Sequence, residues 1–570
     1  KLIKKLQIKF TKITKSKENY PKVFSDMADW NPAEIIGNNP NPLDYSLYDF
    51  LIMKDSWRKG RTRIGYQNQR KNNLMIKFGN KPYVDINKSF NSLIPSNIDK
   101  HHKKKLMKLY VKKLILNPEL HDKVEFEILT TCYDLLTKEK LKKYNFSKKE
   151  IEILEQKLIK FTNKNFLNFE NEYNNSNESI KKMEKERKNV LKKLNESETN
   201  YKKLIKTSEE LLKDCKKYGT IQFSSMARIA FISSTILRSL VKSNYIEQEF
   251  VDNFMNTLVT PLSEFRDSII KYSQHKISKK FILKKYGHLR PGTYDITAKR
   301  YDEQNDFLDQ IKFEKIKKPV IKSPNNLSMI LEKNNIYFKS DFLTIIKNSL
   351  IIREQLKFKF TRNLSDALQL IIEAGVILNF SRKDLSYLEI DYIFNSYKKY
   401  NKKELIKKWK AKIKSQKIKK SINDNLILPP LISSKQDFEI ISYYHARPNY
   451  ITSKSIVSDI INLKKSSDIS LNGKIILLEN ADPGFDWIFA ENPSGLITKY
   501  GGIASHMAIR CAEIGLPAAI GCGEIIFEEL QNSQKILLDC INNKITVLEN
   551  LSTNKFIEER KILKSLGYIK

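Results

Sequence analysis

The stretch from Thr498 to Gly521 constrains this chain more than any other, because it places one histidine between a glycine pair and a short helix. It reads TKYGGIASHMAIRCAEIGLPAAIG, so His506 follows Gly501 and Gly502 and opens an amphipathic segment that stops at Gly-Leu-Pro. Imidazole is nucleophilic and largely neutral near pH 7, so it can accept a phosphoryl group. A helix N-terminus offers unpaired N–H groups and a positive dipole end, which suit the resulting anion. The stretch therefore predicts a phosphohistidine.

Five residues around His506 are candidates for positioning the phosphate. The glycines allow close approach of the backbone, and a serine hydroxyl can cap the helix. An arginine one helical turn after His506 shares its helix face, so it either reaches the phosphate or lies in solvent. The candidates are Thr498, Gly501, Gly502, Ser505 and Arg510.

The same stretch does not have the pattern of a metal site. No second histidine is near, Cys511 falls off the His506 face of the helix, and Glu513 lies about two turns away. We therefore predict no metal ligands.

The pattern Gly-Gly-x-x-Ser-His-x-Ala-Ile, followed by Glu-x-Gly-x-Pro-Ala-x-x-Gly, resembles the swivelling phosphohistidine domain of the phosphoenolpyruvate-utilising enzymes. One position departs from the family pattern, which has an arginine directly before the helix glutamate where this chain has Ala512. Two alternatives remain open at this point. One is a core histidine on an ordinary helix, and the other is a degenerate domain that keeps the fold without phosphotransfer.

Length and charge bound the other possibilities. The chain has 570 residues, which predicts several domains, and a formal net charge of +37. Its lysines are spread through nearly every segment, so nucleic acid is not the favoured partner. The alternative function is a non-enzymatic, basic, helical protein that binds nucleic acid or another protein and carries a relic histidine domain. Sparse cysteines and the lack of a membrane-length apolar run predict a cytoplasmic protein without a membrane partner.

The pattern along the chain predicts a multidomain protein, in which a large, mostly α-helical central domain precedes a small α/β swivelling phosphohistidine domain. The apolar spacing predicts a long helical hairpin at about 148–216, with a break at Asn174–Asn177. The short apolar runs after residue 437 have strand length and alternate with helical segments. The expected units are a mixed segment 1–98, a helical acceptor-binding domain 99–425, a linker 426–436, the phosphohistidine domain 437–548 and a helical tail 549–570.

The order of segments is similar to the rifampicin phosphotransferase type within this family. There, an ATP-binding domain precedes a helical acceptor-binding domain and a terminal histidine domain. This chain has no glycine-rich phosphate loop, so the resemblance implies that ATP and Mg²⁺ are held by a domain upstream or on another chain. About twenty residues follow Leu548. A family barrel needs roughly 250, so phosphoenolpyruvate formation on this chain is not expected.

The resemblance implies an ATP-dependent phosphotransferase of the dikinase type, in which His506 passes a phosphoryl group to a small-molecule or sugar acceptor. The polar loop 286–303 and the Asn-Pro-Ala-Glu segment resemble further family pieces. We expect His288 and Asp295 to form an acid–base pair, and Arg290 and Arg300 to neutralise phosphate. The residues expected to border the same cleft, around Trp30, are Asp29, Asn31 and Glu34.

Overall fold

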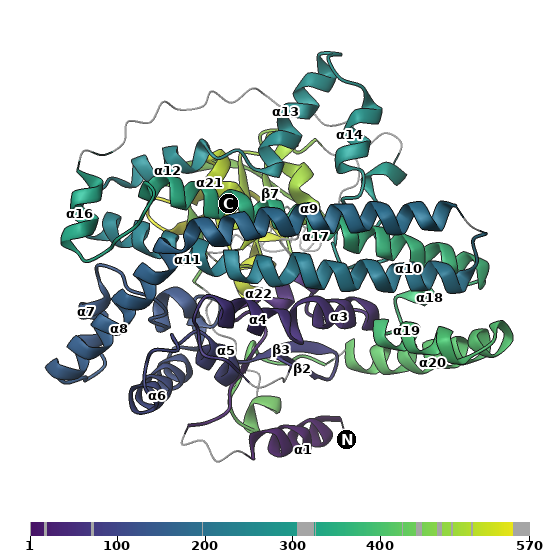
Figure 1. The fold of residues 1–570 in the computed structure, drawn as a ribbon, viewed down its shortest axis with the longest axis horizontal. Helices are drawn as coiled ribbons and strands as arrows, with labels where there is room; N and C mark the ends of the chain where they lie inside the picture. The colour runs from purple at the N-terminus through teal and green to yellow at the C-terminus, as the bar shows by residue number, and fades with distance from the viewer. Residues whose placement is uncertain are drawn as a thin grey trace, which may run out of the picture.

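The structure is a computed structural model that describes residues 2–15, 20–69, 73–196, 198–304, 324, 326–424, 426–439, 447–463, 470–479, 483–502 and 505–550. The chain is mostly helical and carries a separate sheet towards its C-terminus (Figure 1). The first two residues of the predicted helical tail 549–570 are not helical, because they form the end of strand β11 (Lys544–Asn550). The rest of that tail lies outside the described residues.

Four long helices form the centre of the helical part: α9 (Phe169–Asn195), α10 (Tyr201–Asp214), α11 (Ile221–Lys242) and α17 (Phe342–Ile377). Figure 1 shows α9 and α10 running side by side across the molecule. Leucine, isoleucine and phenylalanine side chains from these helices fill two large buried clusters. Burying one such side chain stabilises the fold by about 1.5–3 kcal/mol, so apolar packing holds this helix bundle together.

The predicted break at Asn174–Asn177 was wrong, since α9 runs through it without interruption. Ser176 Oγ donates to the carbonyl of Glu172 at 2.8 Å, and Asn177 Nδ2 donates to Tyr173 O at 3.2 Å. These side chains bond to the preceding turn and so do not compete with the helix. The chain reverses instead between α9 and α10, where Asn200 caps the second helix. Helix α8 (Lys148–Leu167) precedes the hairpin.

The remaining helices surround this centre. They are α1 (Leu2–Thr14), α2 (Pro32–Ile36), α3 (Pro42–Tyr48), α4 (Ser56–Arg63), α5 (Ile86–Ser92), α6 (Lys100–Leu116), α7 (Thr137–Lys142), α12 (Gln248–Asn256), α13 (Pro261–Ser273), α14 (Lys279–Tyr286), α16 (Leu327–Lys333), α18 (Arg382–Leu385), α19 (Ile390–Lys399) and α20 (Lys402–Asp424). None of the helices in the described ranges is long and apolar enough to cross a bilayer.

A small antiparallel sheet joins the start of the chain to the segment that we predicted to be a linker. Its order is β2 (Met75–Phe78), β3 (Lys81–Asp85), β1 (Phe24–Ser25) and β4 (Leu431–Ile432). The prolines of the segment 426–436 are bound as well, because Tyr83 Oη donates to Pro429 O at 2.7 Å and Asp26 N donates to Pro430 O at 3.1 Å. The segment is therefore part of the folded N-terminal region and not a free linker.

The C-terminal sheet has seven strands in the order β11-β10-β6-β7-β8-β9-β5. Its central strands β6 to β9 are parallel neighbours, and the outer pairs are antiparallel. Alternate side chains of β7 and β8 enter two separate apolar clusters, one on each face of the sheet. Helix α21 (His506–Ile514) covers one face and α22 (Gly523–Leu530) the other. The strands are β5 (Asn449–Ile451), β6 (Ser455–Asn462), β7 (Ile475–Leu478), β8 (Gly495–Thr498), β9 (Ala518–Ile520), β10 (Ser533–Asp539) and β11.

Candidate functional site

Helix α21 begins at His506, directly after the loop that follows strand β8. Ser505 is the N-cap, and its Oγ accepts a hydrogen bond from Ala508 N at 3.1 Å. The helix ends at Ile514, where Gly515 adopts a left-handed conformation with φ of 65°. The predicted helix entry and exit are confirmed. The entry lies at the carboxyl end of a parallel strand, where open α/β sheets commonly bind ligands.

The glycines of this loop are packed against protein atoms. Gly521 has φ of 76°, and a Cβ atom added there would lie 2.2 Å from Gly501 O. Thr498 is fully buried, and its Oγ1 accepts from Gly521 N at 3.1 Å. Thr498 and Gly501 therefore fix the backbone on which the entry to α21 rests. The expected contact of Thr498 with phosphate stays a prediction.

The loop before His506 is seated on the N-terminal part of the chain. A Cβ atom added to Gly502 would lie 3.1 Å from Asp122 O and 3.3 Å from Asn31 Nδ2. Asn449 Nδ2 donates to Asp122 Oδ2 at 3.2 Å and to Ile520 O at 3.1 Å, which ties this contact to the C-terminal sheet. Asn31, predicted from the sequence, is thus brought to the loop. Asp122 was missed, because nothing in its neighbouring residues marks it.

The other two residues near Trp30 have different surroundings. Glu34 is almost fully buried, and its Oε2 accepts from Asn31 Nδ2 at 2.9 Å. Asp29 forms a buried, bidentate ion pair with Arg61 and accepts from Ser89 Oγ at 2.6 Å. Asp29 and Asn31 both have positive φ, at 63° and 43°. Asn31 therefore lies at the loop contact and is bonded to Glu34, whereas Asp29 is held by a structural ion pair.

Arg510 has a role that differs from the predicted contact with phosphate. Its guanidinium is 3% exposed and donates to Glu513 Oε2 at 2.7 Å, Thr260 Oγ1 at 2.9 Å and Glu354 Oε2 at 3.2 Å. Burial alone would lower the pKa of Arg510, but Glu513, Asp486 and Glu354 raise it above its usual value. Its charge is already matched, and it ties α21 to α13 and α17.

The expected acid–base pair in the loop 286–303 does not form. His288 is 3% exposed and packs against the Phe358 ring at 4.9 Å, and neither ring nitrogen has a hydrogen-bond partner within the described chain. Asp295 instead accepts from Thr297, through its N–H at 2.8 Å and its hydroxyl at 2.7 Å. Burial, followed by nearby arginines, holds the pKa of His288 well below its usual range, so the ring is neutral.

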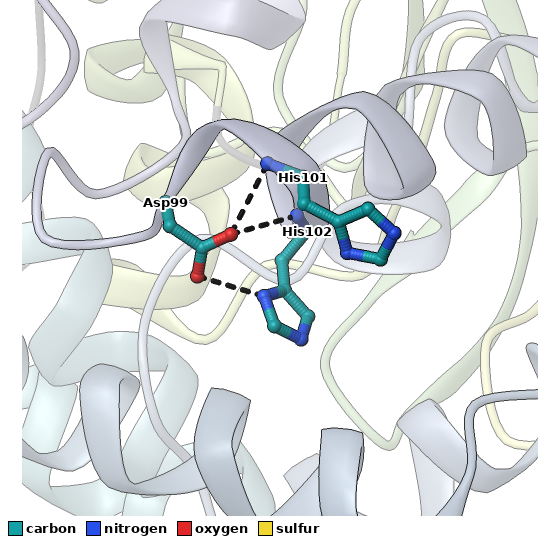
Figure 2. A group of neighbouring side chains, drawn as sticks. All are labelled: Asp99, His101 and His102. Carbon is teal, nitrogen blue, oxygen red and sulfur yellow. Dashed lines mark hydrogen bonds and ion pairs between the residues drawn. The ribbon is translucent and has the colours of Figure 1, made fainter.

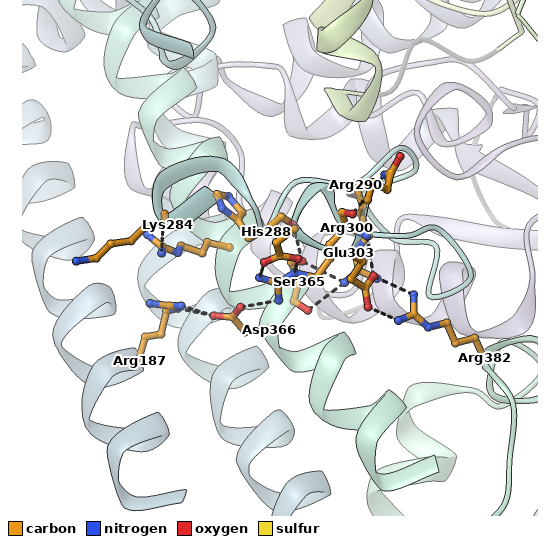
Figure 3. Close-up of polar contacts among 12 residues, drawn as sticks. Arg187, Lys284, His288, Arg290, Arg300, Glu303, Ser365, Asp366 and Arg382 are labelled. Atoms are coloured by element: carbon orange, nitrogen blue, oxygen red, sulfur yellow. Dashed lines mark hydrogen bonds and ion pairs between the residues drawn. The ribbon is translucent and has the colours of Figure 1, made fainter. Parts of the chain in front are cut away.

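The two arginines of this loop are also engaged. Arg290 Nη2 donates to Ser365 Oγ at 3.2 Å, and burial lowers the pKa of Arg290 to about 10. Arg300 pairs with Asp302 at 2.7 Å and with Asp366 at 3.2 Å. Figure 3 shows Arg290 beside Ser365, and Arg300 in a polar network with Asp366, Arg187, Glu303 and Arg382. These contacts hold the loop against α17, and the expected neutralisation of phosphate by the two guanidiniums stays a prediction.

A cavity of about 50 Å³ lies between the loop 286–303, α13, α17 and the C-terminal domain. His288, Arg290 and Arg510 all line it, together with aromatic side chains. The structure therefore brings three of the predicted residues to one place. Arg290 and Arg510 are engaged with other protein groups there, whereas the ring nitrogens of His288 have no hydrogen-bond partner within the described chain.

One group in the described ranges has the spacing of metal ligands. Asp99, His101 and His102 place ligand atoms within 4.8 Å of one another at the start of α6 (Figure 2). Asp99 caps this helix and pairs with Lys157 at 2.6 Å and with His102 at 2.7 Å. Helix capping and ion pairing account for the arrangement, which lies apart from the α21 entry.

Comparison with known proteins points to the same C-terminal region. The profile of the family described as "PEP-utilising enzyme, mobile domain" matches residues 470–543, which include His506. The rifampicin phosphotransferase of Bacillus subtilis is 24% identical over 335 residues, covering 52% of this chain and 35% of that protein. The phosphoenolpyruvate synthase of Neisseria meningitidis is 32% identical over 68 residues, covering 12% of this chain and 8% of that protein.

A third relative is the phosphoenolpyruvate-protein phosphotransferase of Buchnera aphidicola, which is 30% identical over 154 residues. That match covers 24% of this chain and 27% of the relative. This chain therefore spans about a third or less of the curated relatives that it matches. The matched segment carries the glycine, serine and histidine helix entry described above, so the C-terminal region of this chain is similar to the mobile domain of the phosphoenolpyruvate-utilising enzymes.

Proposed function

We propose that this chain is the acceptor side and the phosphohistidine carrier of a phosphotransferase. His506 carries the phosphoryl group, and the C-terminal domain, residues 437–548, moves as a swivelling unit between a donor and the helical part. The resemblance traces the phosphoryl group to ATP and Mg²⁺ on a separate nucleotide-binding domain, in the same polypeptide or on a partner chain. The acceptor is a small molecule or a sugar.

The observation that carries this proposal is the contact between the glycine loop, which contains Gly501 and Gly502, and the N-terminal part of the chain. The loop that leads into His506 rests on Asn31 and Asp122, so the N-terminal end of α21 is directed at the N-terminal part of the chain. A carrier that delivers its group must present that end of the helix to the acceptor.

The described residues do not fit a nucleotide at this place. Gly501 and Gly521 pack on Ile520 and on each other, so they do not frame an open phosphate loop. No step of the mechanism at this seat therefore involves ATP.

Phosphoryl transfer requires mainly positioning and neutralisation of charge. The first-turn N–H groups of α21 supply partial positive charge for a phosphoryl group on His506. The Ser505 cap and the buried Thr498 fix the position of this helix end. Arg510 contributes by holding α21 against α17, not by contacting the phosphate.

Labelling tests the proposal. With the nucleotide-binding domain supplied, β-labelled ATP should give an acid-labile, base-stable label on the parent chain. His506→Ala should carry no label. The matched control is His101→Ala, because His101 is exposed on α6, far along the chain from the site. Undiminished labelling of His506→Ala would overturn the proposal. The alternative, a basic binding protein with a relic domain, is not favoured by the relatives, two of which are named as phosphotransferases.

A further inference from the structure

Asp122 lies where the glycine loop meets the body of the protein. Its carbonyl oxygen would be 3.1 Å from a Cβ atom on Gly502, and its Oδ2 would be 3.4 Å from a Cβ atom on Gly521. The carboxylate also accepts from Asn449 Nδ2 at 3.2 Å. A side-chain carboxylate is thus held beside the loop that leads into His506.

A second carboxylate lies nearby and is not satisfied. Asp26 is 5% exposed, and its Oδ1 has no hydrogen-bond partner within the described chain. His121 Nε2 lies 3.7 Å from this oxygen, which exceeds hydrogen-bond length. Buried polar atoms without partners cost free energy, so each of them calls for an explanation. The unpaired Oδ1 therefore points to a ligand or a proton at this place.

The charges around the two carboxylates suit proton transfer near neutral pH. Burial raises the pKa of Asp122 to about 6, although Lys123 and Asn449 act to lower it. Burial raises the pKa of Asp26 to about 7, against the effect of Lys81. Burial and Lys123 lower the pKa of His121 to about 4. Tyr83 and Tyr500 also face Asp26, and burial raises the pKa of each, so they stay neutral.

Resting on the proposed function, we propose that Asp122 is a further catalytic residue, which takes the proton of the nucleophile that attacks phosphorylated His506. The N–P bond to His506 breaks as a new bond to phosphorus forms. The proton on the attacking atom of the acceptor passes to the Asp122 carboxylate. It then passes to the imidazole nitrogen that phosphorus leaves. Atoms and charge balance, and nothing is oxidised or reduced. In the absence of an acceptor, water takes the place of the nucleophile.

The test uses water as the nucleophile, so it does not require the acceptor. The purified chain is phosphorylated with potassium phosphoramidate, the label is mapped to His506, and its hydrolysis is followed from pH 5 to pH 9. The hydrolysis rate of the parent should include a component that increases as pH rises through about 6, where Asp122 ionises. Asp122→Asn should lose this component and hydrolyse about 10²-fold more slowly at pH 8. An unchanged pH profile in Asp122→Asn would overturn the proposal.

Three further variants separate catalysis from folding. Asp122→Glu should restore part of the pH-dependent component. Asn449→Ala should move its midpoint upwards, because the Asn449 amide favours the ionised form of Asp122. Asp99→Asn removes an exposed helix cap and should leave the profile unchanged. If Asp122→Asn does not fold, an unmoved midpoint in Asn449→Ala overturns the proposal. Failure to label His506 counts against the proposed function, whereas loss of the component alone concerns Asp122.

Discussion

Replacement of Arg510 by methionine distinguishes its two interpretations. The sequence places Arg510 one turn after His506, where it is expected to contact the phosphate. The structure places its guanidinium among Glu513, Glu354 and Asp486, at 2.7, 3.2 and 3.7 Å. Methionine keeps much of the apolar stem and removes the charge. Two carboxylates that are 3% and 7% exposed, those of Glu354 and Glu513, would then lose this cation, and Glu354 would keep its ion pair with Arg353 at 3.1 Å.

The expected cost follows from that burial. Removing one partner of a buried ion pair destabilises a protein by about 3–5 kcal/mol, because the remaining charge is left uncompensated. Arg447→Met is the matched control, since Arg447 is 73% exposed and its ion pair with Glu119 is long, at 3.9 Å. Exposed pairs contribute about 0–1 kcal/mol. Urea unfolding followed by circular dichroism and tryptophan fluorescence should show a large fall in midpoint for Arg510→Met only.

A double-mutant cycle makes the assignment to the ion pair specific. Adding Glu354→Gln removes one of the carboxylates that lose their contact with Arg510 in Arg510→Met. The double variant should be less destabilised than the sum of the two single variants, by about 0.5–3 kcal/mol. The reasoning would be refuted if Arg510→Met unfolds like the parent but no longer accepts a phosphoryl group on His506. That result would restore the phosphate-binding interpretation.

Two further predictions concern the loop seat and its charges. Gly521→Ala should disrupt the entry to α21 and lower the melting temperature, because the new Cβ would lie 2.2 Å from Gly501 O. The control is Gly473→Ala, which is also at positive φ but has nothing within 4 Å, so it should cost only about 1–2 kcal/mol. Equal effects of the two substitutions would contradict the packing argument. Burial raises the pKa of Asp26 to about 7 in the folded state, so its contribution to stability is present below about pH 4 and is lost as pH rises through 7. Asp26→Asn should therefore be more stable than the parent at pH 8, by up to roughly 4 kcal/mol, and no more stable at pH 4; the same difference at both pH values would exclude this cause.

Local sequence patterns predicted the elements that local sequence determines. The serine cap and the glycine stop delimit α21 as expected, and the short apolar runs after residue 470 are strands β7 to β10. Each of these signals lies within about ten residues of the element that it marks. Capping, left-handed glycine and strand-length apolar runs are local properties.

Contacts between distant parts of the chain could not be predicted in the same way. The pairing of Leu431–Ile432 with Phe24–Ser25 joins residues about 400 positions apart, and Pro429-Pro430 indicates only a turn. The seat of Gly502 depends on Asn31 and Asp122, which come from separate elements. Two partners of Arg510, Thr260 at the start of α13 and Glu354 of α17, are distant in the sequence, so its helix position alone did not reveal its burial.

The central claim is that His506 carries the phosphoryl group, and peptide mapping of the phosphorylated protein tests it most directly. The full polypeptide is isolated at alkaline pH after phosphorylation, digested without acid, and its phosphopeptides are sequenced by mass spectrometry. The account predicts an acid-labile phosphoryl group on the peptide that contains His506, and no comparable label on His101, His102, His121, His275, His288 or His445. A phosphoryl group on another residue, with His506 unmodified, would contradict it.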